Sequence, residues 1–168
     1  MTGYDLSLGF IGLGALGLPM AANLRKTGFR LNVHTRSRSP EAAPELLGTR
    51  SCASPAETAE TVDVLMLCVS DDVAVENVLF GPHGAASALQ PGSVVVDCST
   101  IAPSTAMDCA ERLGRKGVNY LDAPVTGGTE GAKAGTLTLL VGGEKDALER
   151  VRPLLEVIGG TIHHFGRV

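Results

Sequence analysis

The sequence predicts an α/β protein, in which a doubly wound, mostly parallel β-sheet of about eight strands carries helices on both faces. Short apolar runs alternate along the chain with segments of helical pattern, and glycines lie on the first turn from a predicted strand to a predicted helix. Strands separated by roughly ten or more helical residues are typical of parallel sheets, because a parallel pair needs a long crossover connection. The 168 residues match the usual size of one domain, so we expect a single domain over residues 1–168.

The predicted strands are short apolar runs. They span residues 6–12, 29–35, 62–69, 92–99, 118–125, 136–143 and 160–165. Residues 62–69 are apolar almost throughout, as expected of a central strand buried on both faces, and the one break, Asp63, lies at the entry end. The last run leads directly to the end of the sequence, with no helix predicted after it.

Prolines and glycines mark the predicted helices. An Ala/Leu-rich segment that ends at Thr27 follows the first strand. Pro40, Pro55 and Pro103 each stand where a first helical turn would begin. Proline is favoured there because the N–H groups of the first turn have no partner within the helix, so the N–H that proline lacks costs no hydrogen bond. Glycines at 28, 48, 92 and 117 lie at the joins between elements.

Composition excludes several classes of function. The chain has 14 basic and 18 acidic residues, a net charge of −4 and no basic run, so we expect no nucleic-acid partner. It has no CxxC pair and no HExxH motif, so the four cysteines are predicted to be reduced core thiols and no metal site is predicted. No apolar run is long enough to cross a membrane and no signal peptide is recognised, so the protein is expected to be cytoplasmic.

Three glycines, Gly12, Gly14 and Gly17, form a GxGxxG motif on the predicted strand-to-helix turn. This context is typical of dinucleotide binding in a Rossmann fold. Gly12 is predicted to permit the tight turn, Gly14 to let the backbone approach a pyrophosphate, and Gly17 to let the helix lie close to the sheet. Amides at the start of the helix would then face the anion. The alternative is a glycine-rich turn that only connects packed elements.

The end of the second predicted strand bears on which dinucleotide is bound. NAD-binding proteins place an acidic residue there for the ribose 2′-hydroxyl, but residues 33–39 contain none. Arg36, flanked by Ser37 and Arg38, instead suits a 2′-phosphate. NADP is therefore the expected cofactor, with NAD possible. The alternative is that Arg36 and Arg38 are ordinary solvated charges.

Four segments follow one another along the chain: the opening, FIGLGALGLPMAANL, then VDCSTIAPST at 96–105, LDAPVTGG at 121–128 and AKAGTLTLLVGG at 132–143. Together they resemble the 3-hydroxyacid dehydrogenase family, which includes 3-hydroxyisobutyrate dehydrogenase, tartronate semialdehyde and glyoxylate reductases and, more distantly, 6-phosphogluconate dehydrogenase. The opening matches the family pattern except that Leu16 replaces the usual methionine. The likeness covers essentially the whole chain. It implies hydride transfer between NADP and a small 3-hydroxyacid or its semialdehyde.

The resemblance also implies site residues. Thr100 would contact the cofactor near its nicotinamide, and Val69 and Ser70 would line the turn after the preceding strand. Thr126, with the amides of Gly127 and Gly128, would hold the substrate carboxylate. The chain departs from the family at Ser70, where proline is usual, and at Thr126, where serine is usual. The predicted cofactor-binding residues are Gly12, Leu13, Gly14, Ala15, Leu16, Gly17, Thr35, Arg36, Ser37, Val69, Ser70 and Thr100.

In the family, a second, all-helical domain supplies a lysine that donates the proton and most of the dimer interface. We expect that domain to be absent here, because no lysine of the sequence lies in a GxxxNxxK segment. The chain is therefore predicted to bind NADP(H) but to turn over poorly or not at all, and the intact protein to be a homo-oligomer. Two alternatives remain, a non-catalytic NADP-binding or interaction module and another NADP-dependent reductase such as an imine reductase.

Overall fold

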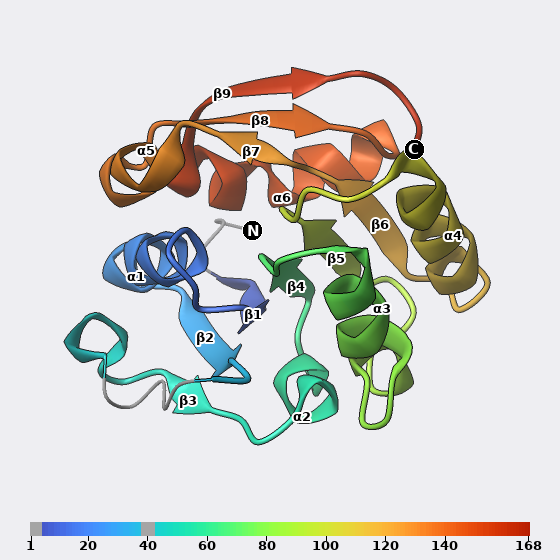
Figure 1. Cartoon of the computed structure of the whole chain (residues 1–168), viewed down its shortest axis with the longest axis horizontal. Coiled ribbons are helices and arrows are strands. Elements are labelled where there is room, and N and C mark those ends of the chain that lie inside the picture. Colours follow the sequence, from blue (N-terminus) through green and yellow to red (C-terminus); the bar gives the residue numbers. More distant parts are fainter. Residues whose placement is uncertain (1–4, 38–42) are drawn as a thin grey trace.

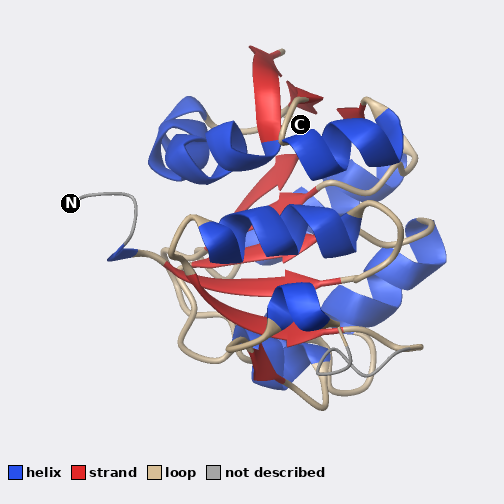
Figure 2. Ribbon diagram, turned by 90° about the vertical axis from the view of Figure 1, so that its left-hand side faces the viewer, coloured by secondary structure: helices blue, strands red, loops and turns tan. Residues whose placement is uncertain are grey.

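The computed structural model describes residues 5–37 and 43–168 and has the predicted α/β architecture, with strands between layers of helices (Figures 1 and 2). The helix start expected at Pro40 and the arginine at position 38 lie outside the described residues. Strands and helices alternate along most of the chain, so the Rossmann-like prediction is confirmed. In the described part no helix is long and apolar enough to cross a membrane.

The larger sheet has six parallel strands in the order β3-β2-β1-β4-β5-β6. Their bounds are β1 (Ser7–Ile11), β2 (Arg30–His34), β3 (Arg50–Ser51), β4 (Val64–Leu67), β5 (Val94–Asp97) and β6 (Asn119–Asp122). The order reverses between β1 and β4, which places the ends of β1, β2 and β4 around one crevice at the carboxyl edge.

A smaller sheet of three strands extends the first, with β7 (Val125–Thr126) antiparallel to β8 (Leu137–Val141) and β8 parallel to β9 (Gly159–His164). A bridge between Asp122 and Gly142 joins β6 to this sheet. The run predicted as one strand over 118–125 is therefore divided between two sheets. The described residues contain nine strands, where the sequence predicted about eight.

The α-helices are α1 (Gly17–Lys26), α2 (Pro55–Ala59), α3 (Asp72–Phe80), α4 (Pro103–Gly114), α5 (Gly128–Ala134) and α6 (Lys145–Ile158), with the 3₁₀ turns η3 (Pro44–Leu46) and η4 (Ala85–Ser87). The helix starts predicted at Pro55 and Pro103 are confirmed. Ser54 caps α2, since its hydroxyl accepts a hydrogen bond from the Glu57 N–H at 3.1 Å, a contact that typically stabilises a helix by about 1 kcal/mol.

Two apolar cores lie on the two faces of the larger sheet, one with α1, α5 and α6 and the other with α2, α3 and α4. Strand β4 contributes to both, because Val64 and Met66 face one core and Leu65 the other. All four of its residues are buried, as expected of the central strand. Asp63 closes the entry end by accepting hydrogen bonds from the Ser7 N–H and hydroxyl.

Candidate functional site

The main cavity, about 560 Å³ in volume, lies where β1, β2 and β4 end. Parallel α/β sheets bind ligands at this place, beyond the carboxyl ends of their strands at the reversal of strand order. All the predicted cofactor-binding residues except Thr100 line the cavity. The sequence did not point to its other lining residues, which are Ile11, His34, Pro55, Cys68, Ala74, Asn77 and Val78.

The three glycines of the turn after β1 differ in their surroundings. Gly12 has a φ of +99°, and a Cβ there would lie 2.1 Å from the Cys68 carbonyl oxygen. A Cβ on Gly17 would lie 1.8 Å from the Gly12 carbonyl oxygen, so only glycine lets α1 approach the turn. The tight turn and the close packing predicted for these two residues are thus observed.

Gly14 faces open space, because a Cβ there would meet no atom within 4 Å. No steric demand of the protein therefore explains this glycine. Leu16, the residue before α1, makes no side-chain cap, and the first turn of α1 contains no acidic residue. A helix start without a side-chain cap or an acidic residue suits a phosphate group, because the helix dipole favours an anion there. The turn thus has the form of a cradle for an anion.

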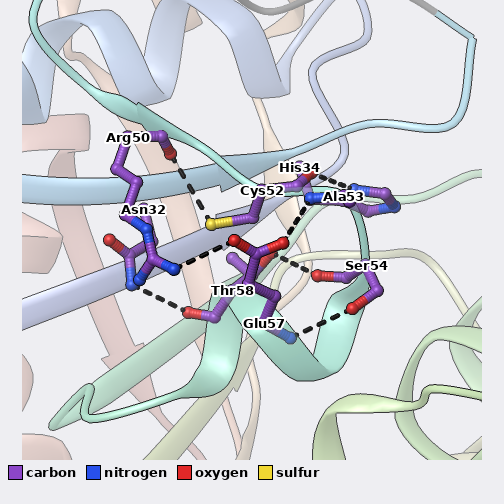
Figure 3. A network of polar contacts seen from close by, with 8 residues as sticks. All are labelled: Asn32, His34, Arg50, Cys52, Ala53, Ser54, Glu57 and Thr58. Atoms are coloured by element: carbon purple, nitrogen blue, oxygen red, sulfur yellow. Dashed lines mark hydrogen bonds and ion pairs between the residues drawn. The ribbon is translucent and has the colours of Figure 1, made fainter.

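The end of β2 forms the next wall, with Thr35 half-buried and Arg36 and Ser37 exposed. His34 is held against the loop that follows β3, because its Nδ1 lies 2.9 Å from the Cys52 carbonyl oxygen (Figure 3). In the same network Glu57 accepts from the Ala53 N–H at 2.7 Å and pairs with Arg50 at 2.9 Å (Figure 3). These contacts fix the start of α2, which contributes Pro55 to the lining.

Val69 and Ser70, in the loop that follows β4, form the wall opposite β2 together with α3. Ala74, Asn77 and Val78 of α3 have the i, i+3, i+4 spacing of one helix face. That spacing could have marked them as neighbours, but the sequence does not say whether such a face meets the core, a cavity or solvent.

The residues predicted to bind the substrate and the nicotinamide lie outside this cavity, farther along the sheet. Thr100 is exposed in the loop after β5. Thr126, Gly127 and Gly128 are exposed at the junction of β7 and α5. Both glycines have positive φ values, +132° and +63°, so backbone geometry alone accounts for glycine at these positions.

A buried polar cluster lies beside the ends of β5 and β6. Asp97 is fully buried and accepts from the Tyr120 hydroxyl and the Ser99 N–H, both at 2.9 Å. Burial raises the pKa of Asp97, and burial together with the charge of Asp97 raises the pKa of Asp122 to about 6. Burial also raises the pKa of the Cys68 thiol, in the cavity wall, to about 11.

The described residues contain no group of His, Cys, Asp and Glu side chains that could hold a metal ion. The cysteines are free thiols, and Cys52, Cys98 and Cys109 are buried as the sequence predicted. Cys68, also predicted to lie in the core, is only half-buried.

Comparison with known proteins extends these observations. Residues 7–166 match the family described as the NAD binding domain of 6-phosphogluconate dehydrogenase. The 2-hydroxy-3-oxopropionate reductase of Escherichia coli is 42% identical over 159 residues, which cover 94% of this chain and 53% of that protein. The 3-hydroxyisobutyrate dehydrogenase of Pseudomonas aeruginosa is 40% identical over 161 residues, which cover 95% of this chain and 53% of that protein.

The structure is also similar to that of Psf3 in complex with NADP+ and 2-OPP, with a TM-score of 0.88 and 36% identity. This match covers 95% of the chain and 56% of Psf3. The chain thus spans about half the length of the relatives that it matches.

Proposed function

Because this chain belongs to the family of the NAD binding domain of 6-phosphogluconate dehydrogenase, with 3-hydroxyacid dehydrogenases among its relatives, we propose that its main cavity binds NADP(H). The turn of Gly12, Gly14 and Gly17 would hold the pyrophosphate. Arg36, with Thr35 and Ser37, would hold the 2′-phosphate. NAD(H), which lacks that phosphate, would bind more weakly.

The observation that carries the proposal is the open space in front of Gly14. The glycines on either side of it are explained by contacts within the protein, whereas Gly14 has no such contact. A residue without a side chain, next to a helix start that no side chain caps, leaves room for a ligand to approach the backbone. The preference for NADP rests on the residues that follow β2, because none of the described residues that line the cavity there is acidic and one is an arginine.

The substrate that the relatives suggest is a small 3-hydroxyacid or its semialdehyde. Thr126 and the amides of Gly127 and Gly128 would hold its carboxylate, and Thr100 would lie near the nicotinamide. NADP(H) would supply or accept the hydride, and the protein would bind and orient the reactants. Among the described residues that line the cavity there is no lysine, and Lys133 is exposed and pairs with Glu130 at 3.1 Å. We therefore propose that this chain alone binds the cofactor without measurable turnover.

Fluorescence titration of NADPH and NADH in separate experiments tests the cofactor assignment. NADPH is expected to bind at least about tenfold more tightly, since a charge-assisted hydrogen bond contributes about 1.5–3 kcal/mol. Arg36→Ala should remove most of this difference and leave NADH binding unchanged. Arg30→Ala is the matched control, because Arg30 is also exposed but lies at the opposite end of the same strand. Equal binding of the two dinucleotides, or binding of neither, would overturn the assignment.

A non-catalytic NADP-binding or interaction module would share the cavity and differ only in the role of Thr126. NADPH oxidation with tartronate semialdehyde, measured on the chain and on an intact relative, separates turnover from binding. Protection of the Thr126–Gly128 segment from hydrogen exchange by 3-hydroxyisobutyrate in the presence of NADP+ would favour a substrate site. The absence of such protection in a chain that binds NADP+ would favour the binding module.

A further inference from the structure

The loop that follows β4 and the start of α3 are joined to the loop that follows β5 by hydrogen bonds between residues distant in sequence. The Val69 N–H donates to Ser99 Oγ at 3.0 Å. The Ala102 N–H donates to Asp72 Oδ1 at 2.9 Å. The first loop contributes Val69 and Ser70 to the cavity wall, and the second carries Thr100. The position of the wall therefore depends on contacts made outside the cavity.

Ser99 does not line the cavity, yet it is itself firmly held. Only 2% of its surface is exposed, and its N–H donates to Asp97 Oδ1 at 2.9 Å. The other carboxylate oxygen of Asp97 accepts from the Tyr120 hydroxyl at 2.9 Å. The chain of contacts thus runs from a tyrosine in β6, through a fully buried carboxylate at the end of β5, to a backbone amide of the cavity wall. A buried network in which each group has a partner fixes the orientation of its members.

We propose that Ser99 is a positioning residue for the dinucleotide cavity, whose hydroxyl holds the Val69 amide and thereby fixes the wall formed by Val69 and Ser70. Asp97 is its anchor, because that carboxylate holds the backbone of Ser99. This inference rests on the proposed function, since a fixed wall affects affinity only if the cavity binds a dinucleotide.

A fixed wall matters because a loop that must be ordered on binding costs affinity. Ser70 is exposed, so the turn is held by the packing of half-buried Val69 against one core and by the hydrogen bond that the Val69 N–H donates to Ser99 Oγ. Truncating the hydroxyl leaves the Val69 amide without its partner and allows the turn to open. The pocket would then have to be reorganised each time that the cofactor binds.

The test compares Ser99→Ala with Ser93→Ala. Ser93 is a matched control because it lies at the opposite end of β5, is 4% exposed and donates a single hydroxyl hydrogen bond to the Gln90 carbonyl at 2.6 Å. Residue-resolved hydrogen exchange measures the Val69 amide without ligand, NADPH titration measures affinity, and thermal melting measures stability.

In Ser99→Ala, exchange at Val69 should accelerate and NADPH should bind more weakly, each by about three- to tenfold, the range that corresponds to one net hydrogen bond. The two variants should lower the melting temperature by similar amounts, and Ser93→Ala should leave exchange at Val69 and NADPH affinity unchanged. Unchanged exchange at Val69, or faster exchange with unchanged affinity, overturns the positioning role. If the unmodified protein binds no dinucleotide, the proposed function fails, and a loss of protection at Val69 would still identify Ser99 as the anchor of the turn.

Discussion

Alanine substitutions at Gly14 and Gly17 should separate binding from folding. The two glycines lie three residues apart in the same turn, but a methyl group meets very different surroundings at each. At Gly17 it would lie 1.8 Å from the Gly12 carbonyl oxygen and 3.2 Å from Phe10 Cε1. At Gly14 it would meet no atom within 4 Å, and Gly14 is not among the glycines with positive φ. Only Gly17→Ala therefore forces the protein to move.

The expected magnitudes follow from these distances. An overlap with backbone atoms forces α1 away from the turn, and overpacking of this kind costs about 3 kcal/mol or more. For a protein of this size, that loss lowers the melting temperature by about 6–12 °C. Gly14→Ala should instead be neutral or stabilise the fold by up to about 1 kcal/mol, because alanine restricts the unfolded chain. Its methyl group would, however, occupy the space where the pyrophosphate approaches the amides.

Thermal melting by circular dichroism, combined with NADPH titration, measures both effects. Gly14→Ala should keep the melting temperature and lose at least about tenfold in affinity, equivalent to about 1.4 kcal/mol. Gly17→Ala serves as the comparison in which stability falls. An unchanged affinity in Gly14→Ala would refute the assignment of this turn to the pyrophosphate. A large loss of stability in that variant would refute the steric reasoning.

Three further predictions concern the buried polar groups. Because burial and Asp97 raise the pKa of Asp122 from 3.8 to about 6, its contribution to stability is complete below pH ~4 and is lost as the pH rises through 6. Asp122→Asn should therefore raise the free energy of unfolding at pH 7.5 by about 1 kcal/mol, a value reduced because the side chain is partly exposed. Urea melts at pH 4.5 and 7.5 measure this effect. A variant less stable than the unmodified protein at pH 7.5 would contradict the prediction. Tyr120→Phe leaves one buried oxygen of Asp97 without its donor and should lower the free energy of unfolding, measured by urea melts, by about 1–3 kcal/mol. A loss below about 0.5 kcal/mol would argue against the network. The thiols of Cys68 and Cys109, with pKa values of about 11 and 12, should react slowly with a disulfide reagent at pH 8 in the native protein and fully after unfolding, and prompt native reaction would show that they are accessible.

The sequence was most informative where a local chemical demand restricts the residue type. The glycine turn and the helix starts at Pro55 and Pro103 are of this kind, because sterics within a few residues decide them. The all-apolar run of β4 was recognisable for a related reason, since burial on both faces leaves no place for a polar side chain.

The missed features depend on contacts distant in sequence. Strand β3 has only two residues, Arg50 and Ser51, and no apolar pattern, so only its pairing with β2 defines it. The division of the run over 118–125 follows from the bridge between Asp122 and Gly142, which turns the chain toward the smaller sheet. The face that α3 presents to the cavity likewise depends on packing, which periodicity does not specify.

The parts of the cavity differ in how strongly the rest of the molecule constrains them. The turn at Gly12 and Gly17 is fixed by backbone sterics, and the wall at Val69 by a partly buried hydrogen bond to Ser99, so changes there disturb the fold. Arg36 and Ser37 are exposed at the rim, where substitutions away from special contacts usually alter stability by less than about 0.5 kcal/mol. In the proposed binding mode, the shape of the pyrophosphate turn at Gly12 and Gly17 is therefore coupled to folding, whereas the open approach at Gly14 and the choice between NADP and NAD are not. We therefore expect that changing the dinucleotide preference of this chain requires only substitutions at the residues that follow β2.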